Sequence, residues 1–216
     1  MEFDEGAFLK RRGVTLYLDV GASRGQSGQF VRRAGYAGRI CSFEPIPESF
    51  GKLSAIAATD PLWEVVNCAI GEREGKADIG ISAHVGASSL REATDTLIAI
   101  YEPIRFIAHA SVDIHRLDGL FDRFARPDDV VHLKVDTQGY ERNVIEGAAG
   151  VLDRIDSMRL EVAVSEVYAG EMVLPEAISM MTERGFLLID AWPAWRHPDT
   201  DEVLHFDLLF RRGTLA

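Results

Sequence analysis

The sequence predicts an α/β fold of three layers, in which helices cover both faces of a mostly parallel, doubly wound β-sheet. Short apolar runs with the length of buried strands alternate with amphipathic stretches of helical periodicity. This alternation requires crossover connections between parallel strands, which are almost always right-handed. Only a polar segment separates the last two strands, so these are expected to form a C-terminal antiparallel hairpin. With 216 residues the chain has the size of a single domain, 1–216.

The elements of the first half begin with a strand at 14–20 (VTLYLDV), which Gly21 closes. A helix follows over 26–34, with Phe30 and Val31 expected to face inward. Each of the next elements is an apolar run or a helical pattern that lies between turn residues. They are a strand at 39–43, a helix at 48–58 that follows two prolines, a strand at 63–70 and a shorter strand at 76–82.

Residues 83–112 show no regular period. A loop of this length in a compact domain often covers a binding site, so we expect a lid here that sets specificity. Its larger side chains are Tyr101, Phe106, Ile107 and His109.

The second half contains the clearest strand, 130–135 (VVHLKV), which Asp136 closes. A short helix at 117–124 precedes this strand. The elements expected after it are a helix at 141–153, a strand at 159–164, a helix at 174–184, a strand at 186–191 that begins after Gly185, a loop at 193–201 and a last strand at 204–210.

The composition limits the possible partners and compartments. The chain has 23 Lys and Arg against 34 Asp and Glu, a net charge of −11 that repels phosphate backbones and disfavours nucleic acid. No apolar run approaches the roughly 20 residues of a membrane span, and the acidic residues 1–5 do not resemble a signal peptide. We therefore expect a cytoplasmic protein with no membrane contact. Cys41 and Cys68 lie in apolar segments without the spacing of a zinc site, and no bound metal is expected.

The turn after the first strand has features of a ligand site. Gly21 and Gly25 bracket it, at the sheet edge where open parallel sheets bind ligands, and the next helix offers its free N–H groups. A dinucleotide fingerprint would need glycines where the chain has Ser23 and Gln26. Asp19 precedes the turn, and a carboxylate there can accept from an ammonium or a hydroxyl, which suits a nucleotide that carries an amino acid.

The ends of the next two strands extend this site. Glu44 stands 23 residues after Gly21, where a carboxylate can bind both ribose hydroxyls, and Cys68 and Ala69 could flank an adenine ring. The structural alternative for the two acids is capping of a turn or a charge near a helix start. Together the features describe a pocket for S-adenosylmethionine. The expected cofactor-binding residues are Asp19, Gly21, Ala22, Ser23, Gly25, Glu44, Pro45, Cys68, Ala69 and Asp136.

From about residue 16 to residue 212 the chain resembles the FkbM-type methyltransferases, a branch of the class I S-adenosylmethionine-dependent enzymes. The matching segments are LDVGASRG at 18–25, FEP at 43–45, NCAIG at 67–71, ASSL at 87–90, RLD at 116–118 and LKVDTQGYE at 133–141. The family often has glutamate where this chain has Gln138. The resemblance implies a Rossmann-like sandwich and methylation of hydroxyl oxygens on sugars, polyketides or other secondary metabolites.

The candidates for chemistry lie on the strand at 130–135 and after it. His132, Lys134 and Asp136 alternate and therefore share one face, with Asp136 nearest the methyl donor. Asp136 is expected to take the acceptor's proton, unless it only caps a helix or pairs with Lys134. Lys134 is expected to orient carboxylates, and His132 to be a core residue.

Further acids complete the predicted site. Glu161 and Glu166 are costly to bury in an apolar run and are expected to face the acceptor. The expected catalytic residues are Asp136, Lys134 and Glu166, and the expected substrate-binding residues are Ser89, Glu141, Glu161 and Glu166. His115 is an alternative base. Trp192, Trp195 and His197 are expected to pack at the edge of the hairpin or in a subunit contact.

Three questions stay open at this point. Glu44 would also suit a nicotinamide-dependent oxidoreductase, and a non-catalytic nucleotide-binding module could keep the same pocket. Methylation of nitrogen is possible because a carboxylate-lined cavity could hold an amine.

The expected partner is a small-molecule acceptor, and a homodimer through the hairpin or the lid is plausible.

Overall fold

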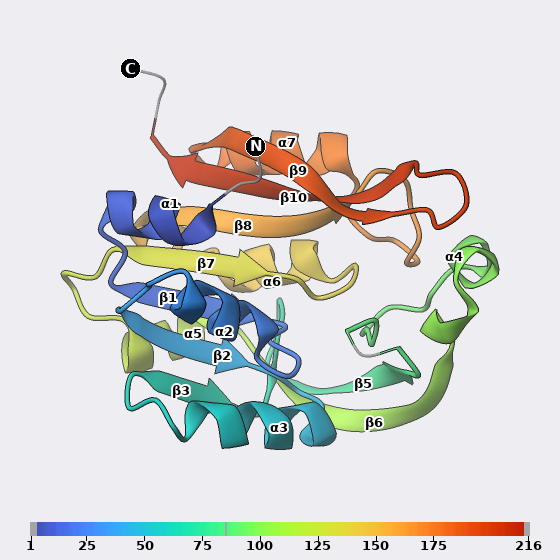
Figure 1. The fold of residues 1–216 in the computed structure, drawn as a ribbon, viewed down its shortest axis with the longest axis horizontal. Coiled ribbons are helices and arrows are strands. Elements are labelled where there is room, and N and C mark those ends of the chain that lie inside the picture. The colour runs from blue at the N-terminus through green and yellow to red at the C-terminus, as the bar shows by residue number, and fades with distance from the viewer. Residues whose placement is uncertain (1–3, 85, 214–216) are drawn as a thin grey trace.

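A central β-sheet of seven strands organises the chain in the computed structural model, which describes residues 4–84 and 86–213 (Figure 1). The strand order is β3-β2-β1-β7-β8-β10-β9, and the first five are parallel while β10 runs antiparallel to both of its neighbours. The strands are β1 (Leu16–Val20), β2 (Arg39–Phe43), β3 (Trp63–Val66), β7 (Val131–Val135), β8 (Ile155–Ala163), β9 (Phe186–Arg196) and β10 (Val203–Arg212). The predicted parallel sheet with a C-terminal hairpin is confirmed.

Helices cover both faces of this sheet (Figure 1). One apolar cluster includes residues of α5 (Leu117–Phe124), α6 (Glu141–Gly147) and α7 (Leu174–Glu183). The cluster on the other face includes residues of α1 (Glu5–Arg12), α2 (Gln26–Arg33) and α3 (Pro47–Ala57). These clusters make the three layers. None of the helices in the described part of the chain is long and apolar enough to span a membrane.

The first helix, α1, was not predicted because its sequence is mostly polar. The Asp4 side chain caps its start by accepting from the backbone N–H of Ala7 at 2.8 Å, and Gly13 ends it with φ +65°. Glu5 is buried on this helix and accepts from the Arg159 guanidinium on β8 at 2.8 Å. This contact between residues 154 positions apart therefore helps to hold α1 on the sheet. No local sequence pattern predicts such a contact.

The segment predicted as one strand at 63–70 divides between two sheets. After β3, the Asn67 amide donates to the Glu44 and Pro45 carbonyls at 2.8 and 3.0 Å, and the chain leaves the main sheet. It then forms β4 (Ala69–Ile70) in a second sheet of order β4-β6-β5. This sheet lies beyond the carboxyl ends of the main strands (Figure 1).

The second sheet also corrects the expectation for 83–112. Its other strands are β5 (Gly75–Ser82) and β6 (Phe106–His115), which pair antiparallel. Between them lie α4 (Asp95–Ile100) and the 3-10 turn η1 (Glu102–Ile104). Only part of the predicted irregular segment is therefore irregular, and its strand has one buried face, with Val112 and Ile114 inward.

Three smaller expectations were also wrong. The helix predicted for 141–153 ends at Gly147, and a 3-10 turn, η2 (Leu152–Arg154), follows. The predicted hairpin loop at 193–201 is shorter, because β9 continues to Arg196. Phe30 is 46% exposed, and only its neighbour Val31 is buried against the sheet.

Candidate active site

The turn after β1 brings two strand ends unusually close. Gly21 has φ +74°, and a Cβ there would lie 1.8 Å from the Asp136 carbonyl oxygen at the end of β7. The N–H groups of Gly21 and Ala22 both donate to the Phe43 carbonyl at 3.1 Å. Gly25, with φ +85°, then starts α2. The turn therefore packs directly against the backbone at the end of β7, and no side chain fits at Gly21.

Gly21→Ala is expected to destabilise the fold by more than the roughly 1–3 kcal/mol of a non-glycine residue held in the left-handed region, because the added Cβ also meets backbone. Gly13→Ala is the matched control, since Gly13 has a similar φ of +65° and open space around it. Urea unfolding of both variants measures the difference. Equal losses for the two variants would contradict the close approach of β1 and β7.

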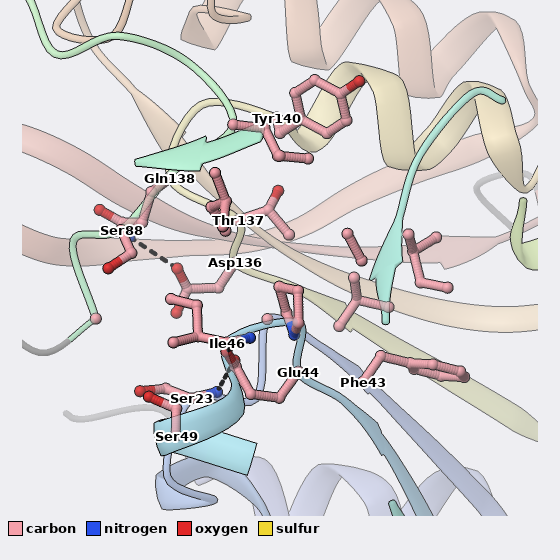
Figure 2. Close-up of a pocket in the computed structure, with 18 of the residues that line it drawn as sticks. Ser23, Phe43, Glu44, Ile46, Ser49, Ser88, Asp136, Thr137, Gln138 and Tyr140 are labelled. Carbon is pink, nitrogen blue, oxygen red and sulfur yellow. Dashed lines mark hydrogen bonds between the residues drawn. The ribbon is translucent and has the colours of Figure 1, made fainter. Parts of the chain in front are cut away.

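Glu44 follows β2 and lines the cleft beside this turn. One carboxylate oxygen accepts from the Ser23 N–H and the other from the Ile46 N–H, both at 2.8 Å (Figure 2). The side chain is buried, which raises its pKa to about 7 even though the two backbone hydrogen bonds work in the opposite direction. Each oxygen keeps a second lone pair with which it can accept from a hydroxyl in the cleft.

The cleft lies beyond the carboxyl ends of β1, β2 and β7 and contains about 860 Å³ of space with its open mouth included. Seven of the predicted cofactor-binding residues line it, namely Gly21, Ser23, Glu44, Pro45, Cys68, Ala69 and Asp136. Figure 2 labels Ser23, Glu44 and Asp136 among them. Ile46, Ile70, Ile79 and Ile81 add an apolar wall. The other three predicted residues, Asp19, Ala22 and Gly25, shape the turn without lining the cleft.

Asp19 and Lys134 form a buried ion pair beneath the turn, across neighbouring strands. The Lys134 ammonium lies 3.1 Å from an Asp19 oxygen and donates to the Gly21 carbonyl at 2.9 Å. The second Asp19 oxygen accepts from Ser42 at 3.2 Å. Both charged side chains are almost fully buried and line neither cavity, so the direct contact expected between Asp19 and a ligand, and the catalytic assignment of Lys134, are not retained. The pair instead fixes the glycine turn from below.

The segment after β7 wraps around one carboxylate. An oxygen of Glu141 accepts from the Thr137 N–H at 2.8 Å, from the Thr137 hydroxyl at 3.0 Å and from the Gly139 N–H at 3.3 Å. Burial raises the pKa of Glu141 to about 7 against these bonds. Glu141 lines neither cavity, so the structure corrects its predicted role as a substrate ligand. It holds the turn that presents Gln138.

Gln138 joins two carboxyl groups. Its amide nitrogen donates to Asp136 at 2.8 Å and to Glu161 on β8 at 2.6 Å. Burial acts to raise the pKa of Asp136, but the Lys134 ammonium and hydrogen bonds from Gln138 and Glu161 outweigh it and leave this pKa below its usual value. Burial and the Asp136 charge raise the pKa of Glu161 well above its usual value. Within the pair, a proton is therefore held by Glu161 in preference to Asp136.

A second cavity lies on the other side of Gln138 and contains about 990 Å³ of space with its mouth included. Asp136 lines the first cleft, Glu161 lines the second cavity, and Gln138 lines both. The further residues around this second space are His84, Gly86, Ala87, Leu97, Tyr101, Ile104, Tyr168, Ala194, Trp195, Pro198 and His205. The segment predicted as a lid thus supplies one wall.

Two residues of this cavity were missed or misread in the sequence. Trp195 was assigned to edge packing, but its ring faces the cavity between Tyr101 and His205, with ring centroids 6.4 and 5.8 Å away. His205 was not singled out, although it is buried on β10. The C-terminal hairpin of β9 and β10 pairs with β8 beside the site, so it brings Trp195 and His205 to this cavity.

Several other predicted residues lie elsewhere. Ser89 is buried outside both cavities and donates to the Gln138 carbonyl at 2.6 Å, while its neighbour Ser88 lines the first cleft. Glu166 is at the surface, where it accepts from the Gly170 N–H at 2.7 Å, so neither its catalytic nor its substrate role is retained. His115 is hydrogen-bonded to Glu74 at 2.6 Å, away from both cavities.

His132 is a core residue, as predicted. It is fully buried, its ring stacks on Tyr17 at 5.3 Å, and its Nδ1 lies 2.9 Å from the Ser157 hydroxyl. Burial lowers its pKa to about 3, so the imidazole is neutral.

Several solved structures of methyltransferases share the fold of this chain. Among solved structures, magnesium protoporphyrin IX methyltransferase from Synechocystis PCC 6803 with bound SAM has a TM-score of 0.53 at 10% identity, over 96% of this chain and 76% of that one. A 1,6-didemethyltoxoflavin-N1-methyltransferase from Burkholderia thailandensis with bound S-adenosylhomocysteine has a TM-score of 0.50 at 14% identity, over 97% and 76%. An rRNA methylase from Streptococcus thermophilus has a TM-score of 0.50 at 11% identity, over 97% and 94%. These structures share the fold.

A search of curated proteins gave no match. The model of the methyltransferase FkbM domain matches residues 19–188, which include the glycine turn, Glu44, the segment from Lys134 to Glu141, and Glu161. The chain therefore belongs to the FkbM methyltransferase family, whose cofactor is S-adenosylmethionine.

Proposed function

We propose that this protein transfers a methyl group from S-adenosylmethionine to a hydroxyl oxygen of a small molecule. The observation that carries the proposal is the carboxyl pair of Asp136 and Glu161, which stands between the cofactor cleft and a second cavity. An alcohol must lose a proton when it is methylated, and the pair is placed to receive it. The net charge of −11 favours a small acceptor over nucleic acid.

The residues of the first cleft fit the cofactor. Gly21 lines the cleft with backbone alone, Glu44 offers carboxylate oxygens to the vicinal ribose hydroxyls, and the apolar wall around Cys68 and Ile46 suits an adenine ring. When bound, S-adenosylmethionine supplies a methyl group already activated on a sulfonium. The protein's own work is then to align the acceptor and to manage its proton.

The proton path follows from the protonation states of the carboxyl pair. Glu161 lines the second cavity and binds a proton in preference to Asp136, which lines the first cleft. As the acceptor hydroxyl gives its proton to Glu161, Glu161 passes its own proton to Asp136. The pair changes from one negative charge to none, and Gln138 keeps both carboxyls in place.

The first experiment is calorimetric titration with S-adenosylhomocysteine and, separately, with NADH. We expect binding of the first and none of the second. A pool of small molecules with hydroxyl or amine groups is then incubated with methyl-labelled cofactor, and the products are identified by mass spectrometry. Label on a hydroxyl oxygen supports the proposal. Preference for NADH, or label on amine nitrogen alone, would overturn it.

The affinity for S-adenosylhomocysteine is expected to rise with pH. Glu44, with a pKa of about 7, is mostly protonated at pH 6 and mostly ionised at pH 8, and only the ionised form accepts from both hydroxyls. The fraction of binding-competent protein changes by roughly tenfold over this range, and the apparent Kd should fall in proportion. Calorimetry at both pH values measures it. Glu44→Gln should abolish the slope, whereas Glu48→Gln should keep it, because Glu48 lines the same cleft with a lowered pKa.

A further inference from the structure

The second cavity has polar groups on one side and apolar walls elsewhere. Glu161 and Gln138 form the polar side. His205 lies near them, because Glu161 pairs with Asp207 on β10 and residues two apart on a strand, such as His205 and Asp207, point to the same face of the sheet. Most of the remaining lining is apolar or aromatic, with Leu97, Ala87, Ile104, Tyr101, Trp195, Ala194 and Pro198. A ligand that fits this arrangement has an apolar body and one polar end.

The charges of the cavity disfavour an anion. Among the described residues that line it, none is Lys or Arg. Burial lowers the pKa of His205 to about 4, so this imidazole is neutral at physiological pH. An anionic ligand would find no Lys or Arg among the described lining residues with which to pair, and an unpaired buried charge is costly. Carboxylate and phosphate compounds are therefore poor occupants.

The aromatic side chains favour a flat ring. Trp195 is only partly buried, and it meets Tyr101 at an interplanar angle of 64° and His205 at 32°. Aromatic pairs in such geometries are stabilised beyond the contribution of their buried area. A sugar would need polar partners around its whole ring, and apolar or aromatic side chains supply most of this lining.

Building on the proposed function, we infer that the second cavity is the acceptor site and that it takes an uncharged aromatic compound whose hydroxyl reaches Glu161 while its ring packs against Trp195. Each part of the cavity lining has its own role in binding the acceptor. Trp195 and Tyr101 select the ring, Glu161 receives the hydroxyl, and the lack of a cation among the described lining residues excludes acids.

Four probes of known chemistry test this inference by calorimetry, with the protein saturated by S-adenosylhomocysteine. They are 2-naphthol, its saturated analogue decahydro-2-naphthol, the anion 2-naphthoate and the sugar methyl β-glucoside. We expect 2-naphthol to bind about tenfold more tightly than each of the others, a ratio that corresponds to roughly 1.4 kcal/mol. Equal binding of the saturated alcohol, tighter binding of the acid or the sugar, or no binding of any probe would overturn the inference.

Two matched variants locate the binding. Trp195→Leu should weaken binding of 2-naphthol by about tenfold and leave the affinity for S-adenosylhomocysteine unchanged. Trp192→Leu is the control, because Trp192 stands on the same strand and packs in the cluster on the helix α1 face instead. Thermal unfolding checks that both variants are folded. Unchanged binding in Trp195→Leu would overturn the assignment of this cavity.

The outcomes also separate this inference from the proposed function. If S-adenosylhomocysteine does not bind, or no hydroxyl is ever methylated, the proposed function fails whatever the probes do. If labelled cofactor methylates hydroxyl compounds of another class while 2-naphthol does not bind, only the inferred acceptor class fails.

Discussion

Glu161→Gln and Asp136→Asn are each expected to lower kcat for methyl transfer by about 10²- to 10⁴-fold, the usual contribution of a positioned proton acceptor. In Glu161→Gln the amide can still donate to Asp136, so the geometry of the pair is kept while the proton relay is cut. Because Glu161 does not line the first cleft, its variant should bind S-adenosylhomocysteine normally. Single-turnover rates with saturating cofactor measure the effect.

Glu166→Gln is the matched control for these two variants. Glu166 is a glutamate only five residues further along the chain, but it is at the surface and lines neither cavity. Its variant should keep the wild-type rate. A full rate in both Glu161→Gln and Asp136→Asn would refute the relay, and a loss in only one of them would assign the proton to that carboxyl alone.

The relay also predicts the acid side of the pH–rate profile. The pKa of Asp136 is held below its ordinary value, and the pair can accept a proton only while Asp136 is ionised. The rate at saturating cofactor should therefore stay level as the pH falls through the usual carboxyl range and decline only below it. A decline centred near pH 7 would point to another group.

Lys134→Met is expected to destabilise the protein by about 3–5 kcal/mol, the cost of removing one partner of a buried ion pair. Asp19 is fully buried, so its carboxylate would lose its counter-charge without gaining water, and the Gly21 carbonyl would lose a donor. The affinity for S-adenosylhomocysteine should fall with it, because the ammonium holds the glycine turn in place. Urea denaturation gives the free energy of unfolding.

Two further variants make this test specific. Adding Asp19→Asn to Lys134→Met should recover part of the lost stability, since it removes the unpaired charge. Lys52→Met should cost no more than about 0.5 kcal/mol, because Lys52 pairs with Glu48 at the surface of α3, where such pairs contribute little. Similar losses in Lys52→Met and Lys134→Met would show that burial of the pair does not matter.

Much of the fold followed from the sequence because its signals are local. β2 and α5 have the predicted bounds, since an apolar run between turn residues and a helical apolar stripe depend on neighbours along the chain. Glu44 was found because a carboxylate directly after a parallel strand must lie at the ligand edge of the sheet. The sequence did not predict the helix α1 or the division of residues 63–70 between two sheets, because both depend on partners far away in the sequence.

The site could be placed from the sequence, but its side chains could not all be assigned. The sequence does not place Gln138 among the site residues, because nothing near an amide in the sequence indicates the two carboxyl groups to which it donates. Glu161 and Glu166 had the same local signal, an acid in an apolar run. Only the structure separates them, since β8 continues through Glu161 and ends before Glu166.

What the sequence by itself determined is the alternation of strands and helices that builds the main sheet, the glycine turn and the acids at the strand ends, all of which are set by periodicity and by the few residues that flank a turn. The tertiary structure decided which of those acids meet. The register of β1 against β7 buries Asp19 with Lys134, and the crossover to β8 brings Glu161 to Gln138. Such contacts depend on sheet order and packing across the whole chain, which no local pattern encodes.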